Sequence, residues 1–152
     1  MRYHLKPATE ADRAWLEELR RSVYQELFVA TWGAWNEARH RRHCDECWER
    51  GNICTVEVKG ERVGMIQVHE DGGGFEVGEI QILPAHQGLG IGSRLLEDVV
   101  ARAHAQDRKV SLSTGLKNIR AVELYERLGF RHVAQSDTHF HLESKPPARG
   151  KP

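Results

Sequence analysis

The chain has 152 residues, a length that fits one domain with a single hydrophobic core. Hydrophobic residues make up 39% of the sequence and charged residues 29%, which is the balance of an ordinary soluble globular protein and excludes a disordered or fibrous chain. Lys and Arg together number 22, as do Asp and Glu, so no net charge draws the chain to nucleic acid or to an anionic membrane.

The first part of the chain predicts a short strand and two helices. A strand pattern covers residues 3–7, and Thr9 then begins a capping-box-like sequence that starts a helix. This helix has one apolar face, on which hydrophobic residues recur every four positions: Trp15, Leu19, Val23 and Leu27. A second helix is predicted over residues 34–49, because Gly33 interrupts the first helix and Gly51 follows the second.

The middle of the chain predicts three strands. Hydrophobic and polar residues alternate over 56–58 and 66–68, a pattern typical of half-buried strands, and we expect the turn between them at Gly60-Glu61. Three consecutive glycines then turn the chain again. Residues 75–83 indicate a further strand, which ends before a proline.

The last part predicts two helices and three strands. A long helix has a hydrophobic face that consists of Leu95, Leu96, Val99, Val100 and Ala103. A strand at 110–112, a helix at 118–128 and two strands at 130–135 and 138–143 follow it. The whole order indicates an α/β (α+β) domain, with a mixed, mostly antiparallel sheet of six to seven strands flanked by about four helices.

This domain is expected to include residues 1–143. No internal repeat and no low-complexity block divides the chain, so one domain accounts for it. The tail at 144–152 contains no large apolar residue that could anchor it to a core, and we expect it to be disordered.

A glycine-rich turn lies between a predicted strand and the long helix: Gln87-Gly88-Leu89-Gly90-Ile91-Gly92-Ser93. Glycines let the backbone approach a ligand closely, and a helix start offers unpaired N–H groups, so the turn suits a phosphate. A phosphate loop of the Gly-Lys-Ser/Thr type is excluded because Ser93 and Arg94 follow Gly92. A dinucleotide fingerprint is excluded because it needs glycine at position 93. A helix start that uses glycines only for tight packing remains the alternative.

The turn resembles the acetyl-CoA loop of the GNAT superfamily of N-acetyltransferases, Gln/Arg-x-x-Gly-x-Gly/Ala, with Gln87, Gly90 and Gly92 at its fixed positions. Residues 118–130 resemble the second motif of that family, Asn-x-x-Ala-x-x-x-Tyr-x-x-x-Gly-Phe. The two motifs follow in the family's order, at the distance that a β-α-β crossover requires. The resemblance covers about residues 50–143 and implies the GNAT fold.

The resemblance also implies acetyl-CoA as the co-substrate and suggests which residues bind it. The pantetheine arm would pair with the backbone of Ile80, Gln81 and Ile82, and the N–H of Ile82 would bind the thioester carbonyl oxygen. The pyrophosphate would lie on the N–H groups of residues 88–93, while Asn118 would bond to the CoA arm.

Direct attack of an amine on the thioester within a ternary complex needs an acid and a base. Tyr125 matches the family's tyrosine and is the predicted acid for the CoA thiolate, although it also falls on the apolar face of its helix and could be a core residue. Glu79 and Gln81 share one face of their strand by alternation, so Glu79 is the predicted base; a solvated strand residue is the alternative. His139 and His141 are further candidates for the base.

The acceptor is expected to be a small-molecule amine or a peptide amine. Trp32 and Trp35 lie in an aromatic stretch, where they could wall an acceptor pocket while Glu37 attracts the cationic amine. Packing of the helices onto the sheet is the alternative for both tryptophans.

Two histidines and two cysteines lie close together in the sequence, at His40, His43, Cys44 and Cys47. They share one predicted helix and no second Cys-x-x-Cys completes a usual zinc set, so we predict no metal. The odd cysteine count, the lack of a secretory signal and the lack of an apolar run of about 20 residues favour a cytoplasmic protein that is not bound to a membrane.

Two functions compete with acetyl transfer. A non-catalytic acyl-CoA-binding or sensor protein of the same fold would keep the glycine-rich turn and could dispense with Tyr125. A protein that binds nucleic acid through the basic run at 39–42 would show salt-sensitive binding, but the balanced charge favours a solvated helix face. A homodimer is compatible with the sequence.

Overall fold

The computed structural model describes residues 2–148. Within these residues it has seven strands, four α-helices and two short 3-10 helices at Glu10–Asp12 and Pro84–His86. The strands and α-helices follow in the order β1 His4–Pro7, α1 Arg13–Trp32, α2 Glu37–Arg50, β2 Ile53–Val58, β3 Glu61–Asp71, β4 Gly74–Ile82, α3 Ile91–Ala105, β5 Val110–Gly115, α4 Ile119–Arg127, β6 Arg131–Gln135 and β7 His139–Ser144. This order is the one predicted from the sequence.

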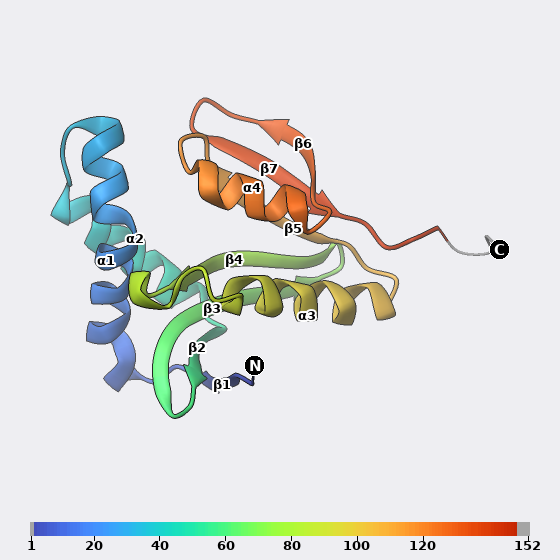
Figure 1. The fold of residues 1–152 in the computed structure, drawn as a ribbon, viewed down its shortest axis with the longest axis horizontal. Helices are drawn as coiled ribbons and strands as arrows, with labels where there is room; N and C mark the ends of the chain where they lie inside the picture. Colours follow the sequence, from blue (N-terminus) through green and yellow to red (C-terminus); the bar gives the residue numbers. More distant parts are fainter. Residues whose placement is uncertain (1, 149–152) are drawn as a thin grey trace. The chain divides into compact units, whose positions relative to one another are not determined.

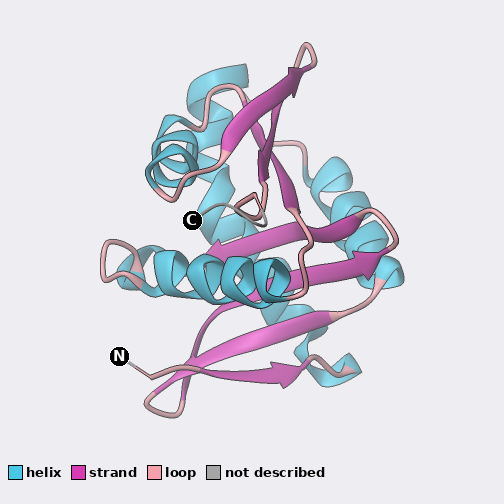
Figure 2. Cartoon of the chain, turned by 90° about the vertical axis from the view of Figure 1, so that its right-hand side faces the viewer, coloured by secondary structure: helices cyan, strands magenta, loops and turns pink. Residues whose placement is uncertain are grey.

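The strands form one hydrogen-bonded sheet in the order β1-β2-β3-β4-β5-β7-β6 (Figure 1). The pairs β1–β2, β2–β3, β5–β7 and β6–β7 are antiparallel. The pair β4–β5 is parallel, and its register covers Phe75–Val77 and Val110–Leu112. β1, which follows the N-terminus in Figure 2, lies at one edge of this order. The mixed, mostly antiparallel sheet with four helices is therefore confirmed.

The chain divides into two compact units. The first contains the residues up to Gln67 together with Glu79–Gly92, and the second contains Val68–Gly78 and the residues from Ser93 onward. β3, β4 and α3 each contribute residues to both units. None of the described helices is both long enough and apolar enough to cross a membrane.

The core of the first unit joins α1 and α2 to β2 and β3. Leu19, Ile53 and Met65 are its buried centre, and the partly buried side chains around them include Trp15, Leu16, Val23, Cys47 and Trp48. Three of the four members of the predicted apolar face, Trp15, Leu19 and Val23, are therefore in this core. The two helices lie side by side in Figure 1, where they are blue and cyan.

The second unit has Phe75 of β4 as its largest fully buried side chain. Its ring contacts two guanidinium groups, those of Arg102 at 5.4 Å and Arg108 at 5.1 Å from the ring centroid. Leu142 of β7 is fully buried as well. The predicted core face of the long helix is buried at four of its five positions, Leu95, Leu96, Val99 and Ala103.

Two predicted boundaries differ from the structure by one to three residues. α2 begins at Glu37 rather than at 34, because Asn36 is its N-cap and accepts a hydrogen bond from the Arg39 N–H at 2.9 Å. The turn between β2 and β3 lies at Lys59-Gly60, both with positive φ, and not at Gly60-Glu61.

The expected tail begins later than residue 144. Ser144 is the last residue of β7, where it pairs with Val110 and is buried. Residues 145–148 have no regular secondary structure, and 149–152 lie outside the described residues. The division into a domain at 1–143 and a disordered tail otherwise stays a prediction.

Candidate functional site

The glycine-rich segment connects β4 directly to α3. After the short helix at Pro84–His86, Gly88 and Gly90 have left-handed backbone, with φ of 78° and 87°, and α3 begins at Ile91. Such angles favour glycine, and they bring the backbone to a helix start whose first N–H groups have no partner within the helix. The first turn of α3 carries no acidic side chain. The segment therefore fits a pyrophosphate.

The Gln87 side chain attaches this segment to the end of β4. Its Nε2 donates a hydrogen bond to the backbone carbonyl of Ile82 at 2.9 Å. Leu83 is held in turn by β3, because its N–H donates to the carbonyl of Val63 at 2.8 Å. The two residues thus fix where the segment leaves the sheet.

Gly64 of β3 lies against the same end of β4, a contact that no pattern in the sequence predicted. A Cβ atom at Gly64 would lie 2.3 Å from the carbonyl oxygen of Gln81 and 2.8 Å from the side chain of Ile82. Only glycine lets the two strands approach this closely. A glycine within a strand pattern is a weak signal of such an approach, and no motif accompanies it here.

Glu79 is a mostly buried carboxylate, with 16% of its side chain exposed, and each of its oxygens has a hydrogen-bond partner. Gln81 Nε2 donates to Glu79 Oε2 at 3.2 Å, so the two side chains share one face of β4, as alternation predicts. His43 Nε2 of α2 lies 2.5 Å from Glu79 Oε1. Burial alone would raise the pKa of Glu79, but the hydrogen bond and charge of His43 and the hydrogen bond from Gln81 outweigh it and lower that pKa.

His43 was not predicted to be part of this site. Its side chain is 40% exposed, whereas that of Glu79 is 16% exposed, so the histidine is the more accessible member of the pair. With Nε2 facing a carboxylate, the ring keeps its other nitrogen, Nδ1, for a second partner. The sequence places residues 43 and 79 far apart, and only the packing of α2 brings them together.

A partly open cavity of about 30 Å³ lies among α1, α2 and the adjoining strands; we call it the α1–α2 cavity. Its polar and sulfur-containing lining includes Glu17, Arg20, His43, Cys44, Cys47 and Gln81. One water takes up roughly 10–15 Å³ by this measure, so the enclosed part holds about two waters or one small polar group.

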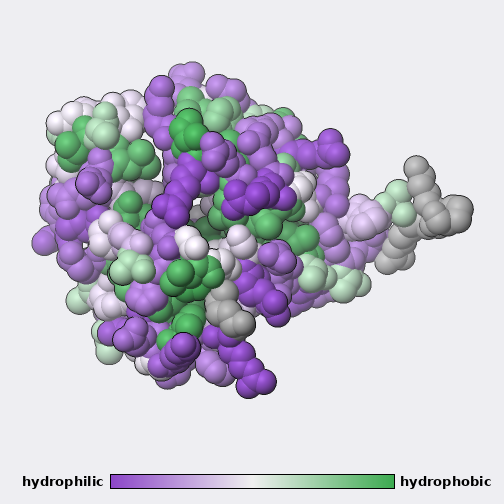
Figure 3. Space-filling view, viewed as in Figure 1, coloured by the Kyte–Doolittle hydropathy of each residue, from purple (hydrophilic) through white to green (hydrophobic). Residues whose placement is uncertain are grey.

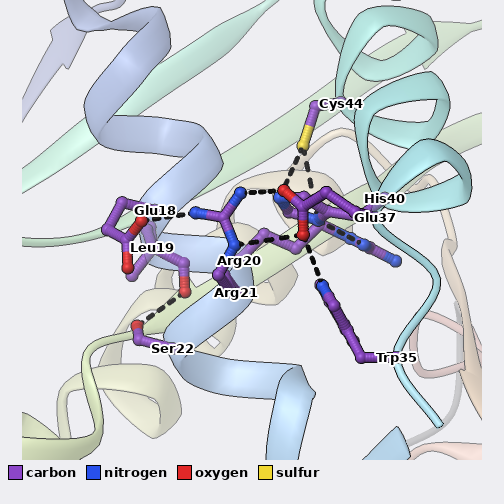
Figure 4. A network of polar contacts seen from close by, with 9 residues as sticks. All are labelled: Glu18, Leu19, Arg20, Arg21, Ser22, Trp35, Glu37, His40 and Cys44. Atoms are coloured by element: carbon purple, nitrogen blue, oxygen red, sulfur yellow. Dashed lines mark hydrogen bonds and ion pairs between the residues drawn. The ribbon is translucent and has the colours of Figure 1, made fainter.

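Arg20 is a buried cation in this lining, with 8% of its surface exposed. Its Nη1 lies 2.8 Å from Nδ1 of His40 (Figure 4). Burial, followed by the charges of Arg20 and Arg21, lowers the pKa of His40, so the imidazole is neutral and its Nδ1 accepts this hydrogen bond. Three aromatic rings face the guanidinium with centroids at 5.5, 5.8 and 5.9 Å; they belong to Tyr24, Phe28 and Trp35.

Of the predicted acceptor-binding residues, the structure brings Trp35 and Glu37 together. Trp35 Nε1 donates to Glu37 Oε2 at 2.7 Å, and Arg21 pairs with the same carboxylate (Figure 4). The hydrogen bonds from Arg21 and Trp35 lower the pKa of Glu37 to about 2. This carboxylate therefore already has a cationic partner within the chain.

Trp32 lies apart from that pair, at the end of α1, and is 67% exposed. Hydrophilic residues cover most of the face seen in Figure 3, and a small apolar patch lies at this end of α1, to the upper left. The acceptor-binding roles of Trp32, Trp35 and Glu37 stay predictions.

Asn118 and Tyr125 belong to the second unit. Asn118 is the N-cap of α4, where its Oδ1 accepts from the Ala121 N–H at 3.4 Å. Tyr125 is 7% exposed, with its ring centroid 6.0 Å from that of Phe130. The predicted roles of Asn118 and Tyr125 toward acetyl-CoA, and the alternative base His141 in the same unit, stay predictions.

Three of the four residues weighed as zinc ligands contact side chains outside the group, and the fourth, Cys44, has its Sγ 3.9 Å from both ring nitrogens of His40. His40 contacts Arg20, and His43 contacts Glu79. Cys47 Sγ donates to Gln67 at 3.2 Å. Among residues 2–148, no group of three or more His, Cys, Asp or Glu side chains is arranged to hold a metal ion.

Comparison with known proteins connects this fold to one family. The model of the acetyltransferase (GNAT) family matches residues 14–130 of the chain. The mycothiol acetyltransferase of Salinispora arenicola (strain CNS-205) is 33% identical over 136 residues, which cover 82% of this chain and 42% of that protein. The chain therefore spans less than half the length of this relative.

Solved structures have the same fold at low sequence identity. PH1933 from Pyrococcus horikoshii OT3 has a TM-score of 0.76 and 20% identity, with 97% of this chain and 100% of that chain covered. The PaiA N-acetyltransferase of Thermoplasma acidophilum, in complex with coenzyme A, has a TM-score of 0.74 and 16% identity, with 95% and 99% covered.

Proposed function

Because the chain belongs to the acetyltransferase (GNAT) family, in which acetyl-CoA is the acetyl donor, we propose that it acetylates the amine of a small molecule or peptide by direct attack within a ternary complex. The observation that carries this proposal is the continuity of β4, the glycine-rich segment and α3. One uninterrupted stretch of chain holds a candidate base, Glu79, and ends in an anion-binding helix start.

The glycine-rich segment is the proposed site for the pyrophosphate of acetyl-CoA, bound by N–H groups of residues 88–93. The pantetheine arm pairs with the backbone of Ile80–Ile82, and the Ile82 N–H stabilises the charge that develops on the thioester oxygen. The parallel β4–β5 register ends at Val77, before these residues, which supports their use by a ligand. Asn118 bonds to the CoA arm through its amide.

The chemistry needs one proton removed and one supplied. The pair of Glu79 and His43 takes the proton of the acceptor ammonium, with His43 as the more exposed member of the pair. The neutral amine nitrogen then forms a bond to the carbonyl carbon, the carbon–sulfur bond breaks, and CoA leaves as a thiolate. The Tyr125 hydroxyl donates a proton to that sulfur, since a phenol and a thiol have similar pKa values.

Thermal unfolding with acetyl-CoA, ATP or NAD tests whether the chain binds the donor. At a hundred times its Kd, a ligand adds about 2.7 kcal/mol, which raises the Tm of a domain of this size by roughly 5–10 °C. We expect a rise with acetyl-CoA alone. The absence of a rise would contradict the assignment of the glycine-rich segment.

Acetyl transfer itself is tested by release of the CoA thiol in the presence of a panel of amines. We expect release that depends on the amine and yields its amide. A Tm rise with acetyl-CoA but no turnover with any amine would instead favour the non-catalytic sensor, because that protein needs the glycine-rich segment and not the Glu79–His43 pair.

A further inference from the structure

Arg20 is a buried cation that forms no ion pair with any described residue. Nη1 is bonded to the neutral His40, and Nε is buried without a hydrogen-bond partner. The remaining nitrogen, Nη2, makes no hydrogen bond within residues 2–148 either. The Glu79 carboxylate acts on this cation through charge alone, so the guanidinium has an electrostatic partner but no hydrogen-bonded anion among the described residues.

The unpaired nitrogens of Arg20 form one edge of the guanidinium group. Nε and Nη2 point their N–H bonds in parallel, which is the fork geometry that a carboxylate binds with both oxygens. The guanidinium carbon lies over the rings of Tyr24, Phe28 and Trp35, at 5.5, 5.8 and 5.9 Å from their centroids. The aromatic contacts therefore stabilise the cation without using its N–H donors, and this edge is left for an anion.

The α1–α2 cavity, which Arg20 lines, also connects this cation to the proposed base. His43 and Gln81 line the same cavity, and both bond to Glu79. The enclosed volume of about 30 Å³ matches one carboxylate group rather than a sugar or an aromatic ring. One small space thus has a cation in its lining and two residues that contact a carboxylate base.

We propose that the α1–α2 cavity binds the carboxylate of the acceptor through Arg20, and that the acceptor is a small amino-carboxylate such as a free amino acid. Its amine lies toward the His43–Glu79 pair. This inference rests on the proposed function, and it narrows the acceptor from any amine to those that also carry a carboxylate. A peptide N-terminus does not fit, because the amide that follows it has no charge for Arg20.

The first experiment changes the acceptor and leaves the protein intact. The twenty standard amino acids are compared with their α-amides and with the amines that remain after decarboxylation, in the CoA-release assay. We expect kcat/KM for the best amino acid to exceed that of its amide about 100-fold, because the amide leaves the Arg20 edge without an anion. Equal rates for acid, amide and amine would overturn the inference while the proposed function stands.

Variants then test whether Arg20 causes the preference. Arg20→Met removes the charge at similar volume, and we expect it to lose most of the acid-over-amide preference while acetyl-CoA still raises its Tm. Arg20→Lys keeps the charge without the fork, and we expect partial retention. Arg41→Met is the matched control, since Arg41 is exposed on α2, and it should keep the full preference.

Binding in the absence of turnover separates the two proposals. Amino acids are added to the protein with CoA, and the Tm is measured for wild type and Arg20→Met. A rise in Tm that depends on Arg20, without acetylation of any amine, would contradict the proposed function and still support the carboxylate site. No rise, together with no acetylation, would overturn both. If Arg20→Met does not fold, the comparison of acids with amides on the wild-type protein decides alone.

Discussion

The glycine-rich segment and the α1–α2 cavity, the two proposed binding sites, offer a ligand different kinds of chemical group. The segment offers backbone N–H groups, whose direction is set by the dihedral angles of consecutive residues such as Gly88 and Gly90. The cavity offers side chains from three elements, namely Arg20 of α1, His43 of α2 and Gln81 of β4. The first is a local property of the chain, whereas the second exists only after the tertiary fold has formed.

Gly90→Val is expected to have the largest effect, because it changes the backbone of the glycine-rich segment, the proposed site for acetyl-CoA. A branched side chain disfavours φ of 87° and occupies the space that the pyrophosphate approaches. We expect acetyl-CoA to cause no rise in Tm for this variant. Gly33→Val is the control: φ there is 83° with open space around it, so it should destabilise the fold and still bind acetyl-CoA. Unchanged affinity in Gly90→Val would contradict the placement of the pyrophosphate.

Glu79→Gln acts on the side-chain site and should lower kcat/KM about 100- to 1000-fold while acetyl-CoA affinity stays the same. His43→Gln should lower kcat/KM by a similar factor. The double variant should be little worse than either single one, because the two residues act as a unit. Glu46→Gln, an exposed change on α2, is the control. Additive losses in the double variant would show that His43 and Glu79 do not share one role.

The same contrast explains what the sequence could predict. The order of elements, the mostly antiparallel sheet and the shared face of Glu79 and Gln81 all depend on periodicity or on neighbours in the chain, and the structure confirms them. The shifted start of α2 depends on one cap, Asn36, which the pattern did not single out.

The partners of Arg20 and His43 could not be predicted in this way. Arg20 and His40 are 20 positions apart, and His43 and Glu79 are 36 apart. Their contacts depend on how α1 and α2 pack, and no local pattern encodes that packing. The sequence therefore indicates no partner for His40, His43 or Cys47, which contact Arg20, Glu79 and Gln67 in the structure.

Tyr125→Phe tests the proposed general acid. It should lower turnover less than loss of the Glu79–His43 pair does. We expect kcat to fall about 100-fold and acetyl-CoA affinity to stay nearly unchanged, because the ring remains and only the proton donor is removed. Tyr3→Phe is the control, because Tyr3 precedes β1 and has no proposed role in the reaction. Wild-type turnover in Tyr125→Phe would remove this residue from the mechanism.

Gly64→Ala tests a residue that bears on both the glycine-rich segment and the α1–α2 cavity. Gly64 sets the position of the end of β4, from which the segment continues and which contributes Gln81 to the cavity. The added Cβ would meet the backbone of Gln81, so we expect a loss of about 1–3 kcal/mol in the free energy of unfolding. Urea denaturation measures this loss. Gly72→Ala, where a Cβ meets nothing within 4 Å, should change stability far less. Equal stability of the two variants would contradict the close approach of β3 and β4.

Glu37→Gln should have the smallest effect, a loss of stability whose size depends on pH. The folded pKa of Glu37, about 2, lies below its ordinary value of 4.5, so the ionised carboxylate stabilises the fold above pH 4.5 and this contribution is lost as pH falls toward 2. We expect the variant to unfold at lower urea concentration than wild type at pH 7 and at the same concentration near pH 2. A constant difference across this range would exclude the pairing with Arg21 as its cause.

Burial of the two cysteines in the α1–α2 cavity has a consequence for side reactions. Burial raises the pKa of Cys44 to about 11 and that of Cys47 to about 12. At pH 7 both thiols are then almost entirely protonated, and the thiolate is the form that reacts with thioesters. If the α1–α2 cavity binds the acceptor as proposed, its two thiols are therefore poor competitors of the amine for the acetyl group.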